Sequence, residues 1–316
     1  PDHAPTNWKS KFGGSAWEYI HELKKWYLRL FDVTQADLNW DNPEVRAELK
    51  EILRFWKEKG IKGFRFDVVN LVSKPEQMED DFEGDGRRFY SDGPHIHEYL
   101  KELIKDTGIE DFVTVGEMSS TSLEHCIRYS ASKEKELSMC FNFHHLKVDY
   151  KDGDKWALMP ADYKKLKELF MEWQIGMQKG DGWNALFWCN HDQPRIVSRL
   201  GDEDIYWKQS AKMLAGMIHF MRGTPYIYQG EELGMLNAHY PSIEQYRDVE
   251  SLNYYHILLE KGKTEKEALE ILSARSRDNS RTPMQWNEKM YGGFSETEPW
   301  IPMSEKFRKE ITVKAQ

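Results

Sequence analysis

The chain has 316 residues, of which 40% are hydrophobic and 31% charged, and its 44 Lys and Arg against 53 Asp and Glu give a net charge of −9. That sign is wrong for a protein whose partner is generic nucleic acid or an anionic membrane, so we expect neither. The most apolar stretch, around 213–221, is far shorter than the roughly 20 residues that cross a bilayer. Three widely spaced cysteines, at 126, 140 and 189, favour reduced thiols in a cytoplasmic protein over a secreted disulfide framework.

Residues 41–60 form the first clear predicted helix. Asp41 and Asn42 are suitable N-caps, and Pro43 suits the first helical position. Apolar residues then recur at helical spacing, which predicts a surface helix with one apolar stripe, and Gly60 ends it. The stripe consists of Val45, Leu49, Ile52, Leu53 and Trp56.

Short apolar strands and helices then alternate along the chain. Strands are predicted at 61–69, 112–117, 137–143, 184–189 and 224–229, with helices at 96–108, about 161–178 and about 204–221. Such alternation implies parallel strands joined by crossover helices. No glycine-rich phosphate loop follows a strand, which favours a (β/α)8 barrel over a doubly wound nucleotide-binding sheet, and we predict no cofactor. After about residue 235 the alternation stops, and 273–286 is typical of a long ordered loop with short helices.

Three carboxylates, Asp67, Glu117 and Asp192, each come at the C-terminal end of a predicted strand. On a parallel barrel such ends meet in one mouth, where crowded carboxylates acquire the shifted pKa values that acid and base chemistry needs. Glycoside hydrolysis uses two suitably placed carboxyl groups. Acids at strand ends also cap helices or pair with arginine, so the pattern by itself leaves a structural role open.

Two further residues lie next to these carboxylates. Arg65 is two residues before Asp67 and therefore on the same strand face, where it could keep that carboxylate ionised or simply form a barrel salt bridge. His191, beside Asp192, could donate a hydrogen bond to a sugar hydroxyl or be a satisfied core histidine. The acidic loop at 81–92 departs from the calcium-binding pattern, so we predict no metal site.

Four segments resemble, in order and spacing, the signature segments of the α-amylase family of glycoside hydrolases. They are Gln35–Trp40, Gly63–Asp67, Val115–Met118 and Asn190–Arg195. The resemblance covers essentially the whole chain and implies a retaining glycosidase. On this match Asp67 is the nucleophile, Glu117 the general acid/base and Asp192 the transition-state stabiliser.

Within the family, the segment 278–286 is similar to the branch that cleaves isomalto-oligosaccharides and trehalose 6-phosphate. The match implies that Arg65 orients the nucleophile and that His191 and Arg281 contact the glucose in the −1 pocket. Segments 85–90, 118–122 and 141–150 resemble the members that act on trehalose 6-phosphate. The finer resemblance therefore implies a small-molecule sugar phosphate as substrate, split at its α,α-1,1 bond into glucose and glucose 6-phosphate.

A 6-phosphate needs local cations in an acidic protein. Candidates that follow a predicted strand end are His144, His145, Lys147 and Lys155. For the lysines a solvated loop is the alternative interpretation. Two other functions also stay open: an α-glucosidase of the same branch that acts on unphosphorylated isomalto-oligosaccharides, or a non-catalytic binding subunit. Retention of all three carboxylates speaks against the binding subunit, and oligomeric state is not predicted.

The family's first signature segment, an Asp-x-x-x-Asn-His run after the third barrel strand, has no counterpart before Asp67. The resemblance therefore implies an incomplete (β/α)8 TIM barrel with about strands four to eight and their helices, without the first three strands and the eighth helix. Residues 1–40 would be the tail of the excursion after the third strand, 41–235 the partial catalytic barrel and 236–316 a long loop and helical subdomain, with the C-terminal β-domain absent. We expect these residues alone to show little or no activity.

Overall fold

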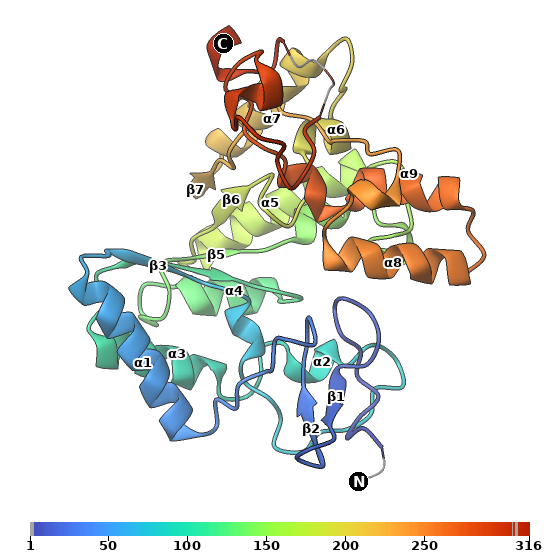
Figure 1. Cartoon of the computed structure of the whole chain (residues 1–316). Helices are drawn as coiled ribbons and strands as arrows, with labels where there is room; N and C mark the ends of the chain where they lie inside the picture. Colours follow the sequence, from blue (N-terminus) through green and yellow to red (C-terminus); the bar gives the residue numbers. More distant parts are fainter. Residues whose placement is uncertain (1–2, 305, 307–308) are drawn as a thin grey trace. The chain divides into compact units, whose positions relative to one another are not determined.

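The computed structural model describes residues 3–304, 306 and 309–316, and the chain divides into two compact units (Figure 1). Unit 1 consists of Pro1–His145, Leu166–Ala185 and Arg222–Thr224, and unit 2 of Leu146–Lys165, Leu186–Met221 and Pro225–Gln316. The division falls within the strands β6 (Ala185–Phe187) and β7 (Thr224–Tyr226), which pair in a two-stranded sheet.

Unit 1 contains a hairpin, a parallel sheet and most of the helices that precede β6 (Figure 1). The hairpin pairs β1 (Trp17–Ile20) with β2 (Lys25–Leu28). The parallel sheet has the order β3 (Gly63–Phe66), β4 (Val113–Glu117), β5 (Met139–Phe141). The helices are α1 (Pro43–Glu58), α2 (Arg87–Tyr90), α3 (Ile96–Thr107), α4 (Leu123–Ser130) and α5 (Tyr163–Lys179), with the 3-10 turn η1 (Val69–Leu71) after β3; residues 163–165 of α5 belong to unit 2.

Unit 2 is built from helices and 3-10 turns around the remaining parts of β6 and β7. The helices are α6 (Ile196–Leu200), α7 (Trp207–His219), α8 (Val249–Glu260) and α9 (Glu265–Arg275). The turns are η3 (Lys151–Gly153), η4 (Ile243–Gln245), η5 (Arg277–Ser280), η6 (Met290–Gly293) and η7 (Val313–Ala315), and η2 (His144–Lys147) crosses from unit 1. The predicted order of strands and helices is confirmed, with strands shorter than predicted.

The register of the parallel sheet brings two candidate residues to one edge. Phe66 of β3 is paired with Gly116 of β4, so Asp67 leaves β3 at the level where β4 ends in Glu117. Gly116 packs closely, because a Cβ there would lie 2.4 Å from Cε of Met118 and 2.6 Å from a Cδ of Leu137. A larger residue would therefore require the side chains of Met118 and Leu137 to move.

Helix α1 has the predicted ends but only part of the predicted stripe. The Asn42 side chain accepts the N–H of Glu44 at 2.9 Å and caps the helix, as expected. Leu53 is buried, and Leu49 packs with it against the cluster of α3. Ile52 and Trp56, two members of the predicted apolar stripe, are 53% and 49% exposed, so the helix buries only part of that stripe. The helix packs against α3 along one narrow line, and residues on its flank stay uncovered.

Each unit has its own core. In unit 1 the core lies between the parallel sheet and helices α3, α4 and α5, and consists of Val69, Ile96, Leu100, Met118, Cys126, Tyr129, Leu137, Cys140, Trp173 and Met177. In unit 2 it joins α8 and α9 to neighbouring loops, and consists of Trp156, Tyr240, Tyr246, Tyr255, Leu258, Ala268, Ile271 and Leu272. The three cysteines are buried and unpaired. No helix within the described residues is long and apolar enough to span a bilayer.

Candidate active site

Arg65 joins two of the predicted catalytic carboxylates in unit 1. Its Nη1 donates to Oδ1 of Asp67 at 2.9 Å, and its Nη2 contacts Oε2 of Glu117. The Glu117 side chain is 9% exposed, whereas that of Asp67 is 70% exposed. Glu117 is therefore buried and Asp67 solvent-exposed, and the guanidinium of Arg65 contacts both.

The loops that carry these carboxylates are tied together by Asn70, which the sequence analysis did not identify. Val68 adopts a left-handed φ of 34°, and the chain then enters η1. Asn70, fully buried, accepts the N–H of Ser119 at 2.8 Å and donates to the carbonyl of Ser119 at 2.7 Å. The same amide donates to Asp92 at 3.1 Å. The signal in the sequence was a single polar residue in the apolar run 68–72.

In unit 2 the structure brings together the three residues predicted to surround the transferred glucose. Asp192 Oδ1 accepts from Nη2 of Arg281 at 2.8 Å, and Asp192 Oδ2 lies 3.3 Å from Nε2 of His191. Arg281 Nε also donates to the carbonyl of His191 at 2.8 Å. This cluster follows β6 and joins η5 to it.

A second arginine, Arg277, also contacts Asp192 and was not predicted. Its Nη1 lies 3.1 Å from Asp192 Oδ1, and its Nε and Nη2 donate to Oδ1 of Asp248 at 2.9 and 2.5 Å. Burial acts to raise the pKa of Asp248, but hydrogen bonds and charge from Arg277, with the charge of Arg281, outweigh it and lower that pKa. Asp248 therefore holds both arginines that contact Asp192. The sequence signal was two arginines four residues apart, at 277 and 281.

The four predicted phosphate contacts are divided between the two units. In unit 1, His144 Nε2 lies 2.8 Å from the carbonyl of Thr121, and His145 is buried with its ring 5.4 Å from that of Phe170. In unit 2, Lys155 Nζ lies 2.7 Å from Oε2 of Glu250. Lys147, also in unit 2, is exposed.

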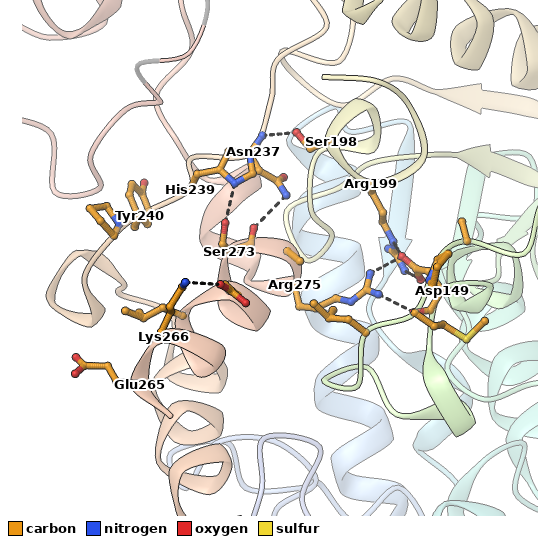
Figure 2. A pocket seen from close by; sticks show the side chains of 18 residues that line it. Asp149, Ser198, Arg199, Asn237, His239, Tyr240, Glu265, Lys266, Ser273 and Arg275 are labelled. Carbon is orange, nitrogen blue, oxygen red and sulfur yellow. Dashed lines mark hydrogen bonds and ion pairs between the residues drawn. The ribbon is translucent and has the colours of Figure 1, made fainter. Parts of the chain in front are cut away.

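A pocket of about 860 Å³ lies elsewhere in unit 2 and contains none of the predicted site residues. It is lined by α9 together with the segments 158–161 and 237–241, and Figure 2 shows its interior. Asp149 pairs there with Arg199, at 2.8 Å, and with Arg275. Among the described residues, no three His, Cys, Asp or Glu side chains gather closely enough to hold a metal ion.

Residues 1–316 match the family model described as "Alpha amylase, catalytic domain". The chain therefore belongs to the α-amylase family of catalytic domains. It is 59% identical over 312 residues to the trehalose-6-phosphate hydrolase of Bacillus subtilis (strain 168), covering 98% of this chain and 55% of that protein. It is 57% identical over 316 residues to the trehalose-6-phosphate hydrolase of Escherichia coli (strain K12), covering 100% and 57%. The oligo-1,6-glucosidase of Bacillus cereus is 45% identical over 317 residues, covering 98% and 56%.

Solved structures agree with this assignment. The crystal structure of the trehalose-6-phosphate hydrolase TreA of Bacillus licheniformis matches with a TM-score of 0.91 at 60% identity, covering 98% of this chain and 56% of that chain. The isomaltulose synthase of Erwinia rhapontici NX5 matches with a TM-score of 0.93 at 37% identity, covering 100% and 57%. The chain thus spans little more than half the length of the relatives it matches.

Proposed function

We propose that the full-length protein hydrolyses trehalose 6-phosphate to glucose and glucose 6-phosphate with retention at the anomeric carbon. The observation that carries this proposal is the identity of 59% and 57% to two trehalose-6-phosphate hydrolases, against 45% to an oligo-1,6-glucosidase over a similar length. The proposed substrate is thus a small sugar phosphate. Because the net charge of the chain is −9, its phosphate group must be bound by positively charged side chains close to it.

We also propose that β3 to β7 are strands four to eight of a (β/α)8 barrel. On this proposal residues 1–40 are the tail of the excursion after the third strand, 41–235 belong to the barrel and 236–316 form the loop and helical subdomain after the eighth strand. The proposal assigns the first three strands, the eighth helix and the C-terminal β-domain of the family to sequence outside these residues. The parallel order β3-β4-β5 supports the assignment of the first three of these strands.

In the proposed first step, the Asp67 carboxylate attacks C1 of the glucosyl unit. The bond from C1 to the bridging oxygen breaks, and Glu117 gives its proton to that oxygen, which leaves as glucose 6-phosphate. In the second step Glu117 takes a proton from water, whose oxygen attacks C1. The ester bond to Asp67 breaks, glucose is released, and both acids return to their starting states.

The remaining predicted residues take supporting parts in this proposal. Asp192 stabilises the positive charge that develops at C1, and His191 and Arg281, which lie against it, contact the same glucose. Arg65 orients Asp67 through its 2.9 Å contact. The phosphate is contacted by Lys147 and Lys155, with His144 and His145 near the same segment of chain.

The test is a comparison of kcat/KM for trehalose 6-phosphate, trehalose and isomaltose in the full-length protein. We expect trehalose 6-phosphate to be preferred at least about 100-fold, and Lys147→Ala to narrow that preference about tenfold, as loss of a charged hydrogen bond does. Asp67→Asn should lower kcat by about 10³-fold or more, whereas Asp111→Asn, an exposed acid of the same unit, should not.

Equal use of the unphosphorylated sugars would instead identify an α-glucosidase of the same branch. Undetectable turnover of all three sugars by a folded full-length protein would favour the binding subunit. Proton NMR of the first glucose released reports the configuration, and the β-anomer would contradict the double displacement.

A further inference from the structure

A chain of ion pairs within unit 2 connects Lys155 with Asp192. Lys155 Nζ lies 2.7 Å from Oε2 of Glu250, and the same oxygen lies 3.4 Å from Nε of Arg277. Arg277 Nη1 is in turn 3.1 Å from Oδ1 of Asp192. The proposed function places Lys155 at the phosphate and Asp192 at the transferred glucose, so two side chains link the two parts of the substrate site.

The linking side chains are shielded from water. The side chain of Glu250 is 10% exposed and that of Arg277 is 12% exposed. Ion pairs in such surroundings are screened by salt much less than surface pairs, and a change of charge at one member alters the balance at the next. A change in the contacts of Lys155 can therefore alter the electrostatic environment of Asp192.

Two oxygens in the chain are shared between competing cations. Glu250 Oε2 is shared by Lys155 and Arg277, and Asp192 Oδ1 is shared by Arg277 and Arg281. Each guanidinium that contacts Asp192 neutralises part of its negative charge. The carboxylate is then less able to stabilise a glucosyl cation. Arg277 thus partly neutralises the carboxylate that the proposed reaction uses.

We propose that Glu250 and Arg277 form a relay through which the phosphate of the substrate activates Asp192, an inference that rests on the proposed function. The phosphate competes with Glu250 for Lys155. Glu250 then attracts Arg277 more strongly, because Arg277 is the other cation on its Oε2. The contact of Arg277 with Asp192 weakens, and Asp192 gains charge for the transition state.

The relay has a kinetic signature that simple phosphate binding lacks. Contacts that hold the phosphate equally in substrate and transition state lower KM and leave kcat unchanged. Activation of Asp192 acts when charge develops at C1 and therefore raises kcat. Glu250 and Arg277 are positioning residues in this scheme, since they act through Lys155 and Asp192.

The test is the ratio of kcat for trehalose 6-phosphate to kcat for trehalose in the full-length protein and in Glu250→Gln, which keeps the shape and removes the charge. We expect the ratio to exceed ten in the wild type and to fall about tenfold in the variant, a coupling of about 1.4 kcal/mol. KM for trehalose 6-phosphate should not rise, because Lys155 has lost its competitor. Inorganic phosphate should raise kcat for trehalose in the wild type and not in the variant.

Two further variants distinguish loss of the relay from a general loss of folding. Glu203→Gln is the matched control, because Glu203 is also a partly buried carboxylate of unit 2, and its described contacts, to Lys306 at 3.4 Å, His239 and Ser198, include no member of the relay. Its kcat ratio should equal that of the wild type. Lys155→Gln cuts the chain at its phosphate end, and should lower the kcat ratio as much as Glu250→Gln does, with no additional loss in the double variant.

The outcomes separate the relay from the proposed function. A wild type that prefers trehalose 6-phosphate, with a kcat ratio unchanged in folded Glu250→Gln and in Lys155→Gln, would overturn the relay and leave the function standing. A preference expressed in KM alone would do the same. A wild type without preference for the phosphorylated sugar would overturn both.

Discussion

Glu231 is a partly buried carboxyl group outside the proposed catalytic machinery, and its Oε1 atom is buried. Its Oε1 has no hydrogen-bond partner within the described residues, and its Oε2 has a long contact of 3.5 Å from the N–H of Tyr228. Burial raises its pKa from 4.5 to about 7, against smaller opposite effects of Tyr228, Cys189 and Arg195. The folded protein therefore keeps this proton at pH values where an unfolded chain has lost it.

This difference predicts how Glu231→Gln changes stability. Between about pH 4.5 and pH 7, unfolding of the wild type releases the proton of Glu231, so stability falls as the pH rises through that window and stays lower above it. The glutamine carries no such proton. By urea unfolding of the full-length protein, the variant should match the wild type near pH 4.5 and exceed it by about 3 kcal/mol at pH 8.

The exposed neighbour Glu232 offers a control at the adjacent position. Glu232→Gln should change the free energy of unfolding by less than about 0.5 kcal/mol at either pH. If Glu231→Gln were less stable than the wild type at pH 8, the carboxylate would have to be paired in the folded protein, and the assigned cause of its high pKa would be wrong.

At the scale of elements, the connection between the loops after β3 and β4 depends on one amide. Asn70→Ala removes both hydrogen bonds to Ser119 and leaves a buried N–H and a buried C=O without their partner. We expect a loss of about 2–3 kcal/mol in the free energy of unfolding, and a decrease in kcat of about 100-fold as Asp67 and Glu117 lose their relative position.

The capping box of α9 provides the comparison for Asn70. Thr264 accepts the N–H of Glu267 at 3.2 Å, and Thr264→Ala should cost about 1 kcal/mol with kcat unchanged. An Asn70→Ala variant with wild-type kcat, measured well below its melting temperature, would contradict the positioning role.

Capping residues and glycines predicted where helices begin and end better than the apolar pattern predicted which side of a helix is buried. Asn42 and Pro43 determine the start of α1, and Gly108, at a left-handed φ of 63°, ends α3. Which side of α1 is covered depends on α3, whose residues come some 50 positions later, and so the exposure of Ile52 and Trp56 was not visible in the sequence.

The same limit explains the missed site residues. Asn70 acts on a partner 49 positions away, and Arg277 on one 85 positions away. Neither distance leaves a periodic pattern in the chain. The carboxylates Asp67, Glu117 and Asp192 were predicted because strand ends and family signatures mark them locally. Their roles stay predictions until the variants are measured.

At the scale of the whole molecule, β3 is an edge strand of its sheet, and α1 leaves apolar side chains uncovered. Ile52, Phe55 and Trp56 are each about half exposed, at 53%, 51% and 49%. Such an edge and face favour association with further chain. We expect the 316 residues alone to hydrolyse trehalose 6-phosphate at least about 100-fold more slowly than the full-length protein, and to self-associate in sedimentation velocity.

A monomeric 316-residue protein with full activity would contradict this expectation. It would also require a different explanation for the uncovered side chains of α1. Substituting Ile52 and Trp56 by Glu and Lys should reduce self-association without restoring activity, because the charges block contact between copies and add nothing to the proposed active site.

In the proposed reaction, the guanidinium of Arg65 couples the charge states of Asp67 and Glu117, because it contacts both. When the glucosyl ester forms, Asp67 loses its negative charge, and Arg65 has one anionic neighbour fewer. Its whole charge then acts on Glu117, which has just given away its proton, and stabilises the ionised form that must next accept a proton from water. On the proposed mechanism, a single arginine thus makes each half of the reaction prepare the acid/base for the other half.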